Sequence, residues 1–163
     1  MLILGASGGV GTLTIQLAKN AGAKVIGVAS EKNHPYMEEL GADATIDYSK
    51  SHVGEAVKEI EPEGVDLIFH CSRGDSLEQS MSTLKKGGHL ISITNSKPDV
   101  REDVKFQYVF VEPNAVQLKK IQELTDNGKI KLSVTKSYPL DDAAKALQEI
   151  ESLHTKGKLV ITP

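Results

Sequence analysis

The sequence predicts an α/β protein built on a doubly wound, parallel, six-stranded sheet that is followed by a C-terminal tail. Two observations support this prediction. Short apolar runs alternate with segments of helical periodicity over most of the chain, and parallel strands need helical crossovers of that kind. A glycine-rich turn, Gly5-Ala-Ser-Gly-Gly-Val-Gly11, also joins the first apolar run to the first helix. The length of 163 residues suffices for one domain with a full core and part of a second.

The strands of the sheet are recognised from apolar runs, and the helices from apolar residues at helical spacing. Residues 24–29 are apolar almost throughout, which is typical of a strand that is buried on both faces. Gly22 can end the first helix, and Pro35 can occupy the first position of the second. A later helix is expected to stop at Gly87-Gly88. The expected strands are residues 1–6, 24–29, 44–48, 65–71, 89–94 and 104–111, and the expected helices are residues 10–21, 35–40, 53–60, 77–84 and 114–126.

The pattern loosens beyond residue 94, and the last part of the chain is expected to form a tail. A polar loop precedes the sixth strand, and the helix after that strand ends near Gly128. The expected elements of the tail are a strand at 132–138, a helix at 141–153 and a strand at 158–162. We therefore expect the sheet domain in residues 1–131 and a strand–helix–strand tail in residues 132–163.

Composition and charge exclude several classes of function. The net charge is −3 and the signs are interspersed, so no basic stripe is present and nucleic acid is not an expected partner. The single cysteine, Cys71, excludes an internal disulfide and a zinc site built from several cysteines. No apolar run approaches the roughly 20 residues that span a bilayer, so no membrane partner is expected. The apolar start lacks the basic region of a signal peptide, and a cytoplasmic location is expected.

The glycine-rich turn has the features of a phosphate-binding turn. Gly8, Gly9 and Gly11 can supply a sharp bend, a place where the backbone touches a pyrophosphate, and close contact between helix and strand. The following helix would point free N–H groups and its positive dipole end at the phosphates. Read as G-x-G-x-x-G, the motif has Ala6 at its first glycine. It follows a strand and opens a helix, which favours dinucleotide binding over the alternative of a merely tight turn.

The end of the second strand indicates which dinucleotide is bound. An NAD site places Asp or Glu about 20 residues after the glycines, whereas this chain has Ala29 there. A small residue leaves room for a 2′-phosphate, to which Ser30 and Asn33 can donate hydrogen bonds, while Lys32 brings positive charge. Glu31 opposes this only if it points inward. The sequence therefore predicts NADP, and the alternative is an ordinary polar loop with a solvated lysine.

Two other enzyme classes share parts of this pattern. The turn also fits short-chain dehydrogenases, but these need a Tyr-x-x-x-Lys pair for proton transfer, and none of the four tyrosines has a lysine four residues later. Residues 84–91, Leu-Lys-Lys-Gly-Gly-His-Leu-Ile, resemble a turn common in methyltransferases. Those enzymes bind the ribose of S-adenosylmethionine through an acidic residue at the end of the second strand, and Ala29 does not fit that role.

Four stretches together resemble the medium-chain dehydrogenase/reductase superfamily, and within it the quinone oxidoreductase (zinc-type alcohol dehydrogenase-like) branch. They are GASGGVGTLTIQLAKNAGAKVIGVAS, LGADATIDY, LKKGGHLISI and HTKGKLVITP. The resemblance implies a Rossmann domain and covers essentially the whole chain. It also implies a GroES-like catalytic domain ahead of this one, so the chain is expected to be the cofactor-binding half only, with a tail that packs on that domain. The catalytic residues are therefore unknown, and His70-Cys71 is not expected to bind a metal.

The resemblance assigns cofactor contacts to individual residues. It implies that residues 7–11 contact the pyrophosphate, that Tyr48 lies beside the 2′-phosphate, and that the backbone of Cys71 lies near the cofactor. Family members often have acidic-x-Val-Gly-Gly after the fourth strand, where this chain has His70-Cys-Ser-Arg-Gly74, so the ribose contacts are not carried over. The full set of expected cofactor-binding residues is Ser7, Gly8, Gly9, Val10, Gly11, Ser30, Lys32, Asn33, Tyr48, Cys71, Ile93 and Thr94.

The resemblance implies an enzyme that transfers hydride from NADPH to a quinone, an enone or a similar carbonyl compound. The alternative is a non-catalytic NADP-binding module, either a redox sensor or a subunit that depends on a partner. Residues 104–111 are expected to form the edge strand, and in the family this strand pairs across a two-fold axis to give a homodimer. Proline at Val109 is then expected to yield a monomer. The alternative is that a loop or the tail covers this edge.

Overall fold

The computed structural model describes residues 1–152 and 155–163, and its main feature is a six-stranded sheet in which every neighbouring pair is parallel. The strand order is β3-β2-β1-β4-β5-β6, which confirms the predicted doubly wound fold. The strands are β1 (Leu2–Leu4), β2 (Ile26–Ala29), β3 (Ala44–Asp47), β4 (Val65–His70), β5 (Leu84–Ser92) and β6 (Lys105–Tyr108). The chain enters the centre of the sheet at β1, moves outward to β3, and returns to β4 on the other side of β1.

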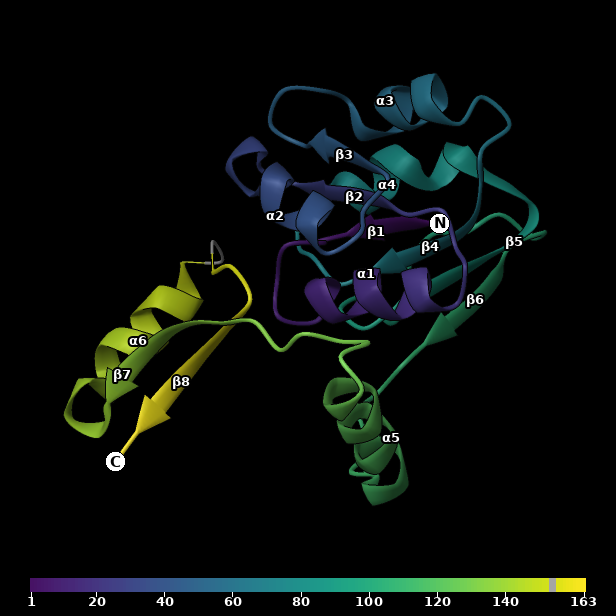
Figure 1. The fold of residues 1–163 in the computed structure, drawn as a ribbon. Helices are drawn as coiled ribbons and strands as arrows, with labels where there is room; N and C mark the ends of the chain where they lie inside the picture. The colour runs from purple at the N-terminus through teal and green to yellow at the C-terminus, as the bar shows by residue number, and fades with distance from the viewer. Residues whose placement is uncertain (153–154) are drawn as a thin grey trace.

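Helices cover both faces of the sheet (Figure 1). These helices are α1 (Gly11–Asn20), α2 (His34–Glu39), α3 (Val53–Ile60) and α4 (Ser76–Ser80), with short 3₁₀ helices at Glu31–Asn33 and Met81–Thr83. One core cluster joins Leu2 and Leu4 to Val57 of α3 and Leu77 of α4. A second cluster on the opposite face contains Ile3, Ile15 of α1 and Met37 of α2. Alternation along β1 therefore supplies both cores, as expected of a central strand.

The fourth helical segment, α4 followed by the 3₁₀ turn Met81–Thr83, confirms the expected helix over residues 77–84 up to its last residue, but it stops before the glycine pair at which it was expected to end. The α-helix stops at Ser80, and Leu84 already pairs with Val65 as the first residue of β5. The pairing then shifts before His89, so Gly87 and its neighbour lie within an irregular part of β5. Burial of the Leu84 side chain, which is 3 % exposed, explains why the strand begins before the glycines.

The C-terminal part forms a separate unit in which a helix packs beside a two-stranded parallel sheet (Figure 1). Helix α5 (Ala115–Asp126) precedes it, and the unit contains β7 (Val134–Pro139), the 3₁₀ turn Leu140–Asp142, α6 (Ala143–Glu151) and β8 (Lys158–Thr162). The Asn114 side chain caps α5 by accepting from the N–H of Gln117 at 3.0 Å. The predicted last residue of the tail helix, Leu153, lies outside the described residues.

The segment between α5 and β7 is bound along helix α1. The Gln16 side chain donates to the carbonyl of Lys131 at 3.1 Å and accepts from its N–H at 2.7 Å. Asn20 donates to the carbonyl of Lys129 at 2.8 Å, and Ile130 between these two residues is 2 % exposed. These hydrogen bonds give partners to backbone groups of residues 129 and 131, and they hold this segment next to α1.

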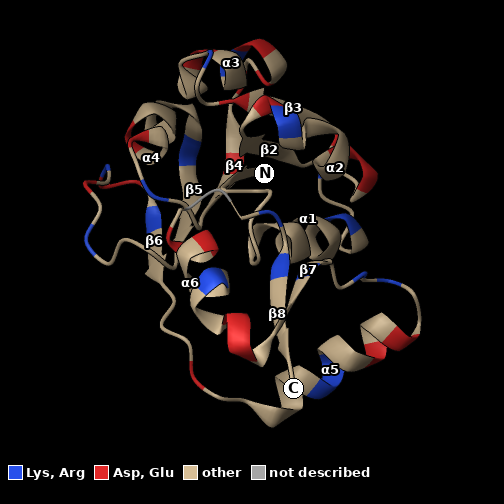
Figure 2. Ribbon diagram, turned by 90° about the vertical axis from the view of Figure 1, so that its left-hand side faces the viewer, with Lys and Arg blue, Asp and Glu red and all other residues tan. Residues whose placement is uncertain are grey.

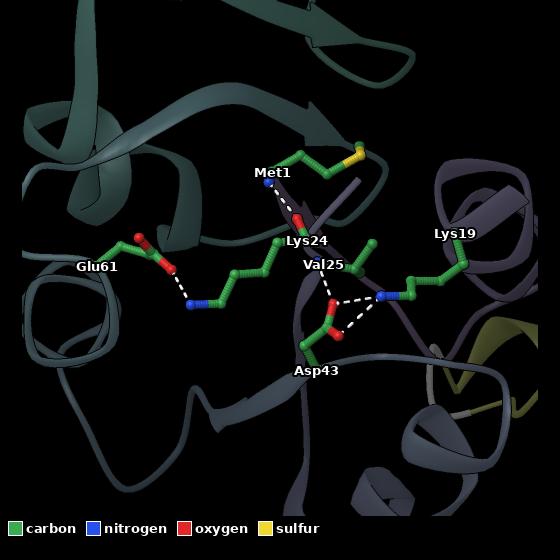
Figure 3. A network of polar contacts seen from close by, with 6 residues as sticks. All are labelled: Met1, Lys19, Lys24, Val25, Asp43 and Glu61. Carbon is green, nitrogen blue, oxygen red and sulfur yellow. Dashed lines mark hydrogen bonds and ion pairs between the residues drawn. The ribbon is translucent and has the colours of Figure 1, made fainter. Parts of the chain in front are cut away.

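The amino ends of the strands are joined by polar contacts on the side away from the glycine-rich turn (Figure 3). Asp43 accepts hydrogen bonds from the N–H of Val25 at 2.7 Å and from Lys19 Nζ at 2.8 Å. It therefore links the start of β2 to helix α1. The hydrogen bond from the Lys19 ammonium is the main cause that holds the pKa of Asp43 below its usual value, and the hydrogen bond from the Val25 N–H is the next.

Charged residues of both signs are interspersed over the sheet domain and the C-terminal unit (Figure 2). Among the helices of residues 1–152 and 155–163, none is long and apolar enough to cross a bilayer.

Candidate cofactor-binding site

A cleft of about 510 Å³ opens at the carboxyl ends of the central strands, beside the glycine-rich turn. The strand order reverses between β1 and β4, so the connection that leaves β1 and the connection that leaves β4 run to opposite sides of this point. In doubly wound sheets ligands bind in the crevice at such a reversal. The residues that line the cleft are Gly5, Ser7, Gly8, Val28, Ala29, Ser30, Asn33, Tyr48, Cys71, Ser72, Arg73, Gly74, Ser76, Thr94, Ser152 and Thr155.

The glycines of the turn have different structural tasks. Gly5 makes the bend at φ +85°, a conformation that side chains disfavour. A Cβ on Gly11 would lie 2.2 Å from the Gly5 carbonyl oxygen and 2.6 Å from Ala6 Cα, so its absence lets α1 contact the strand end. A Cβ on Gly8 would meet only the Gly5 oxygen, at 3.4 Å, and Gly8 lines the cleft. Gly11 is therefore required for the packing of α1 on the strand end, whereas Gly8 leaves open space at the cleft.

The start of helix α1 provides unpaired hydrogen-bond donors. The N–H groups of Gly9 and Val10 have no acceptor among residues 1–152 and 155–163. The helix begins at Gly11, and its first turn contains no acidic residue. Free donors and the positive end of the helix dipole together favour an anion at this position.

A small polar cluster joins the glycine turn to the end of β2. The Asn33 side chain donates to Ser7 Oγ and to Ser30 Oγ, each at 3.2 Å, and Asn33 is 7 % exposed. All three residues line the cleft. The segment expected to contact the 2′-phosphate is thus connected to the segment expected to contact the pyrophosphate.

The charged residues after β2 turn away from the cleft. Glu31 forms an ion pair with Lys50, and 65 % of its side chain is exposed, so it does not place a carboxylate at the end of β2. Lys32 is also exposed and does not line the cleft. Tyr48 lines it and is 46 % exposed. Among the described lining residues, Arg73 is the charged one, and no carboxylate faces the cleft.

His70 and Cys71 lie at the end of β4 and point to opposite faces. Cys71 donates from Sγ to the Leu4 carbonyl at 3.0 Å, and burial raises the pKa of its thiol to about 12. His70 is 4 % exposed, and its Nδ1 lies 3.0 Å from Ser92 Oγ. The same Ser92 oxygen accepts from the N–H of Asn95 at 2.9 Å, and burial lowers the pKa of His70. His70 is therefore part of a buried polar network, beyond the packing role expected for it.

The cleft brings together part of the predicted site. Seven expected residues line it, namely Ser7, Gly8, Ser30, Asn33, Tyr48, Cys71 and Thr94. The other five, Gly9, Val10, Gly11, Lys32 and Ile93, lie outside the lining. Sequence reasoning missed Ser72, Arg73, Ser76, Ser152 and Thr155. Arg73 could have been found from the sequence, because it lies in the segment His70–Gly74 that begins at the end of the fourth strand. Thr155 is distant in sequence from the strand ends that form the cleft, and only the tertiary fold brings it there.

The residues present fit a dinucleotide but not a metal ion. Ser72 lines the cleft, and its buried Oγ has no hydrogen-bond partner in the described chain, which leaves one polar group for a ligand. The bare Gly8, the free N–H groups and the absence of facing carboxylates suit a polyanion. Within residues 1–152 and 155–163 no group of three or more His, Cys, Asp or Glu residues is placed to hold a metal ion.

Comparison with known proteins identifies similar chains. The family model described as zinc-binding dehydrogenase matches residues 40–161. A probable zinc-binding oxidoreductase, mitochondrial, from Arthroderma benhamiae is 32% identical over 166 residues, covering 98% of this chain and 50% of that protein. The chain spans about half the length of the curated relatives that it matches.

Solved structures show the same arrangement. The quinone oxidoreductase from Coxiella burnetii has a TM-score of 0.88 and 28% identity, with 99% of this chain and 52% of that chain covered. The Escherichia coli quinone oxidoreductase complexed with NADPH has a TM-score of 0.84 and 26% identity, with 99% of this chain and 56% of that chain covered.

Proposed function

Because the chain belongs to the zinc-binding dehydrogenase family, we propose that it is the NADPH-binding half of an oxidoreductase that reduces a quinone, an enone or a similar carbonyl compound. In this proposal residues 1–131 bind the cofactor, and residues 132–163 return toward a catalytic domain. The relatives are about twice as long as this chain, and one structural match is a quinone oxidoreductase with bound NADPH. Both facts support the proposal.

The observation that supports it best is the composition of the cleft at the end of β2. Ala29 stands where NAD-binding sites place a carboxylate, and Glu31 is turned outward to Lys50. Ser7, Ser30 and Asn33 line the cleft there instead, and the Asn33 amide donates to both hydroxyl groups. A carboxylate would repel a 2′-phosphate, whereas these groups are neutral, which favours NADPH over NADH.

The residues of this chain bind and orient the cofactor. The N–H groups of Gly9 and Val10 would hold the pyrophosphate, Ser30, Asn33 and Tyr48 the ribose phosphate, and Thr94 the nicotinamide end. The reduced nicotinamide supplies a hydride when bound. Thr94 is itself positioned, because its Oγ1 donates to the Ser72 carbonyl at 3.0 Å. Holding the reacting atoms in place and excluding water is the contribution of such a domain to catalysis.

The described residues of this chain do not form a zinc site. The nearest candidates, His70 and Cys71, face opposite sides of β4 and are engaged with Ser92 and Leu4. We assign no catalytic residue within the chain, and we propose that substrate and proton donor contacts come from the other half of the enzyme.

Titration of NADPH and NADH into the purified chain tests the proposal. We expect NADPH to bind at least tenfold more tightly, and equal or tighter binding of NADH would refute the assignment of NADP. Ala29→Asp should shift the preference toward NADH. The chain alone should reduce quinones and enones negligibly, and turnover proportional to its concentration would refute the division between the two halves. A full-length protein that binds NADPH without any turnover would favour the non-catalytic alternative.

We also propose that the protein is a homodimer that pairs through β6. This strand ends the sheet order, and no described strand pairs with its outer side. Phe106 packs against the core, whereas Tyr108 and Phe110 are 39 % and 77 % exposed. An uncovered edge with exposed aromatic side chains is suited to pairing with a second copy.

The structure corrects the position at which proline should block this pairing. The Val109 N–H donates to the Ser92 carbonyl at 2.9 Å, so proline there would break a bond inside the sheet. Hydrogen-bonding directions alternate along a strand, and the N–H of Tyr108 therefore points to the outer side. Tyr108 is the position whose donor a second copy would use.

A further inference from the structure

We propose that His70, at the end of β4, is a positioning residue for the nicotinamide side of the cleft, and that its neutral ring holds the segment that carries Thr94 in place. Protonation of the ring would release this segment, so cofactor binding would weaken as the pH falls. The inference rests on the proposed function, because it assumes that a nicotinamide dinucleotide occupies the cleft. It goes beyond that function, because it makes the cofactor site sensitive to pH through a residue that does not line the cleft.

The first observation is the set of hydrogen bonds around Ser92, which is 0 % exposed at the end of β5. Ser92 Oγ accepts from the N–H of Thr94 at 3.3 Å and from the N–H of Asn95 at 2.9 Å. A hydroxyl oxygen has two lone pairs and one hydrogen, so these two bonds occupy both lone pairs. The hydrogen is left for His70 Nδ1, at 3.0 Å, and no other acceptor for it lies within reach in residues 1–152 and 155–163. Nδ1 therefore carries no hydrogen.

The second observation concerns the other ring nitrogen. Thr94 Oγ1 lies 3.3 Å from His70 Nδ1 and 3.5 Å from Nε2, and it donates to the Ser72 carbonyl at 3.0 Å. Because its own hydrogen is used by Ser72, Thr94 Oγ1 can only accept from the ring, which places the imidazole hydrogen on Nε2. The neutral ring thereby joins the end of β4 to the segments that follow β4 and β5. Ser72 and Thr94 of these two segments line the cleft.

The third observation is what a second ring hydrogen would do. An imidazolium donates from both nitrogens, so Nδ1–H would face a Ser92 oxygen that already accepts two backbone N–H groups. One of these N–H groups would lose its acceptor, and the Ser92 hydrogen would have no partner. Buried polar groups without partners are unfavourable, so the segment with Thr94 and Asn95 would have to move. Protonation of His70 is thus coupled to the position of a residue that lines the cleft.

The surroundings of His70 favour the neutral ring. Burial lowers its pKa, whereas the Glu78 carboxylate and the Ser72 backbone act in the opposite direction and more weakly. Strand β1 contributes no charged residue, and the other titratable or charged residues of the neighbouring segments are Cys71, Arg73, Asp75, His89 and Lys97. The Cys71 side chain points to the opposite face of β4, and the other four residues are exposed. The ring is therefore neutral above its lowered pKa, and the coupling acts below that pKa.

Nitrogen-15 NMR of the cofactor-free chain tests the arrangement of hydrogens directly. At about pH 7.5 we expect His70 to carry its hydrogen on Nε2 and none on Nδ1. As the pH falls, the amide signals of Thr94 and Asn95 should shift with the same midpoint as the His70 ring, and this transition should be absent from His70→Asn. A hydrogen on Nδ1 at about pH 7.5, or amide signals that do not follow the His70 titration, would overturn the inference.

Calorimetry of NADPH and NADH binding to the wild type, His70→Asn, His70→Leu and His89→Asn tests the consequence for the cofactor. At about pH 7.5, His70→Asn keeps an acceptor for Ser92 Oγ and should stay within about threefold of the wild type. His70→Leu removes the acceptor and should weaken both nucleotides roughly tenfold, as is typical of one lost buried hydrogen bond. His89 is exposed on β5 and lies outside the cleft lining, so His89→Asn is the matched control for the loss of one histidine.

The pH profile separates positioning from a merely structural role. We expect the ratio of the wild-type to the His70→Asn dissociation constant to rise at least about threefold from about pH 7.5 to about pH 5, for both nucleotides. A ring that must be neutral for binding weakens the affinity by up to about tenfold per pH unit below its pKa. The 2′-phosphate of NADPH also titrates, but it does so against every variant, so the ratio removes its contribution. His89→Asn should follow the wild-type profile.

The outcomes distinguish this inference from the proposed function. Parallel pH profiles for the wild type and His70→Asn, an effect confined to NADPH, or a His89→Asn profile that matches His70→Asn would overturn the inference while the proposed function stood. If His70→Leu does not fold, the comparison with His70→Asn still decides. A wild-type chain that binds neither nucleotide would refute the proposed function, and the positioning role of His70 with it.

Discussion

Gly11→Ala should lower the stability of the fold, whereas Gly8→Ala should weaken NADPH binding, although both substitutions add one methyl group to the same turn. The Gly11 methyl would lie 2.2 Å from the Gly5 oxygen, 2.6 Å from Ala6 Cα and 2.8 Å from the Ala6 carbonyl carbon. All three atoms are backbone, so they cannot be relieved by a rotamer change. Helix α1 would have to move from the end of β1 by on the order of 1 Å to restore ordinary contacts.

The size of the effect follows from two opposing contributions. Overpacking of this kind costs about 1–3 kcal/mol, and alanine in place of glycine in a helix returns at most about 1 kcal/mol. We expect Gly11→Ala to lower the free energy of unfolding by roughly 2 kcal/mol, which corresponds to about 4–8 °C in melting temperature for a chain of this length. Gly8→Ala meets only the Gly5 oxygen at 3.4 Å and should stay within about 1 kcal/mol of the wild type.

Urea unfolding followed by circular dichroism measures the stabilities, and NADPH titration measures the binding. Gly8 lines the cleft, so its methyl group would occupy space near the pyrophosphate, and we expect at least tenfold weaker binding in Gly8→Ala. Gly11→Ala as stable as the wild type would refute the packing role of Gly11. Wild-type affinity in Gly8→Ala would refute the ligand role of Gly8.

Three further predictions concern the edge strand, the thiol and the amino ends of the strands. Tyr108→Pro should convert the proposed homodimer to a monomer in sedimentation while the fold persists, and a wild type that is monomeric at tens of micromolar would contradict the dimer. Cys71, whose pKa burial raises to about 12, should react with a thiol reagent at pH 8 at least a hundredfold more slowly in the native protein than in urea, and comparable rates would contradict its burial. Asp43→Asn should cost about 1 kcal/mol at pH 7, because it removes the negative charge that faces Lys19 and one of the two oxygens that accept from Lys19 and Val25. Because the pKa of Asp43 is lowered in the folded state, this difference should be complete above about pH 5 and should vanish as the pH falls through that lowered pKa, and a pH-independent difference in urea unfolding would contradict the account.

The sequence by itself determined the fold class and the position of the glycine-rich turn that lines the cleft. Apolar periodicity is a local property, so it predicted the helix at Val53–Ile60 at both ends and every strand of the sheet except the start of β5 to within a few residues. The glycine spacing and the small residue at Ala29 are also local signals, because turn geometry and strand ends depend on neighbouring residues. Local signals failed at Gly87, where pairing of Leu84 with Val65 overrode the expected helix end.

Only the tertiary structure decided which distant groups meet at the turn. Gln16 binds the Lys131 backbone, Gly157 donates to Ser7, and the Lys158 side chain then lies over Gly9. No periodicity or spacing relates residue 158 to residue 9, because their contact depends on the packing of the whole tail against α1. The direction of the Val109 N–H was likewise undetermined until the register of β6 on β5 was known, since a shift of one residue reverses every donor along a strand.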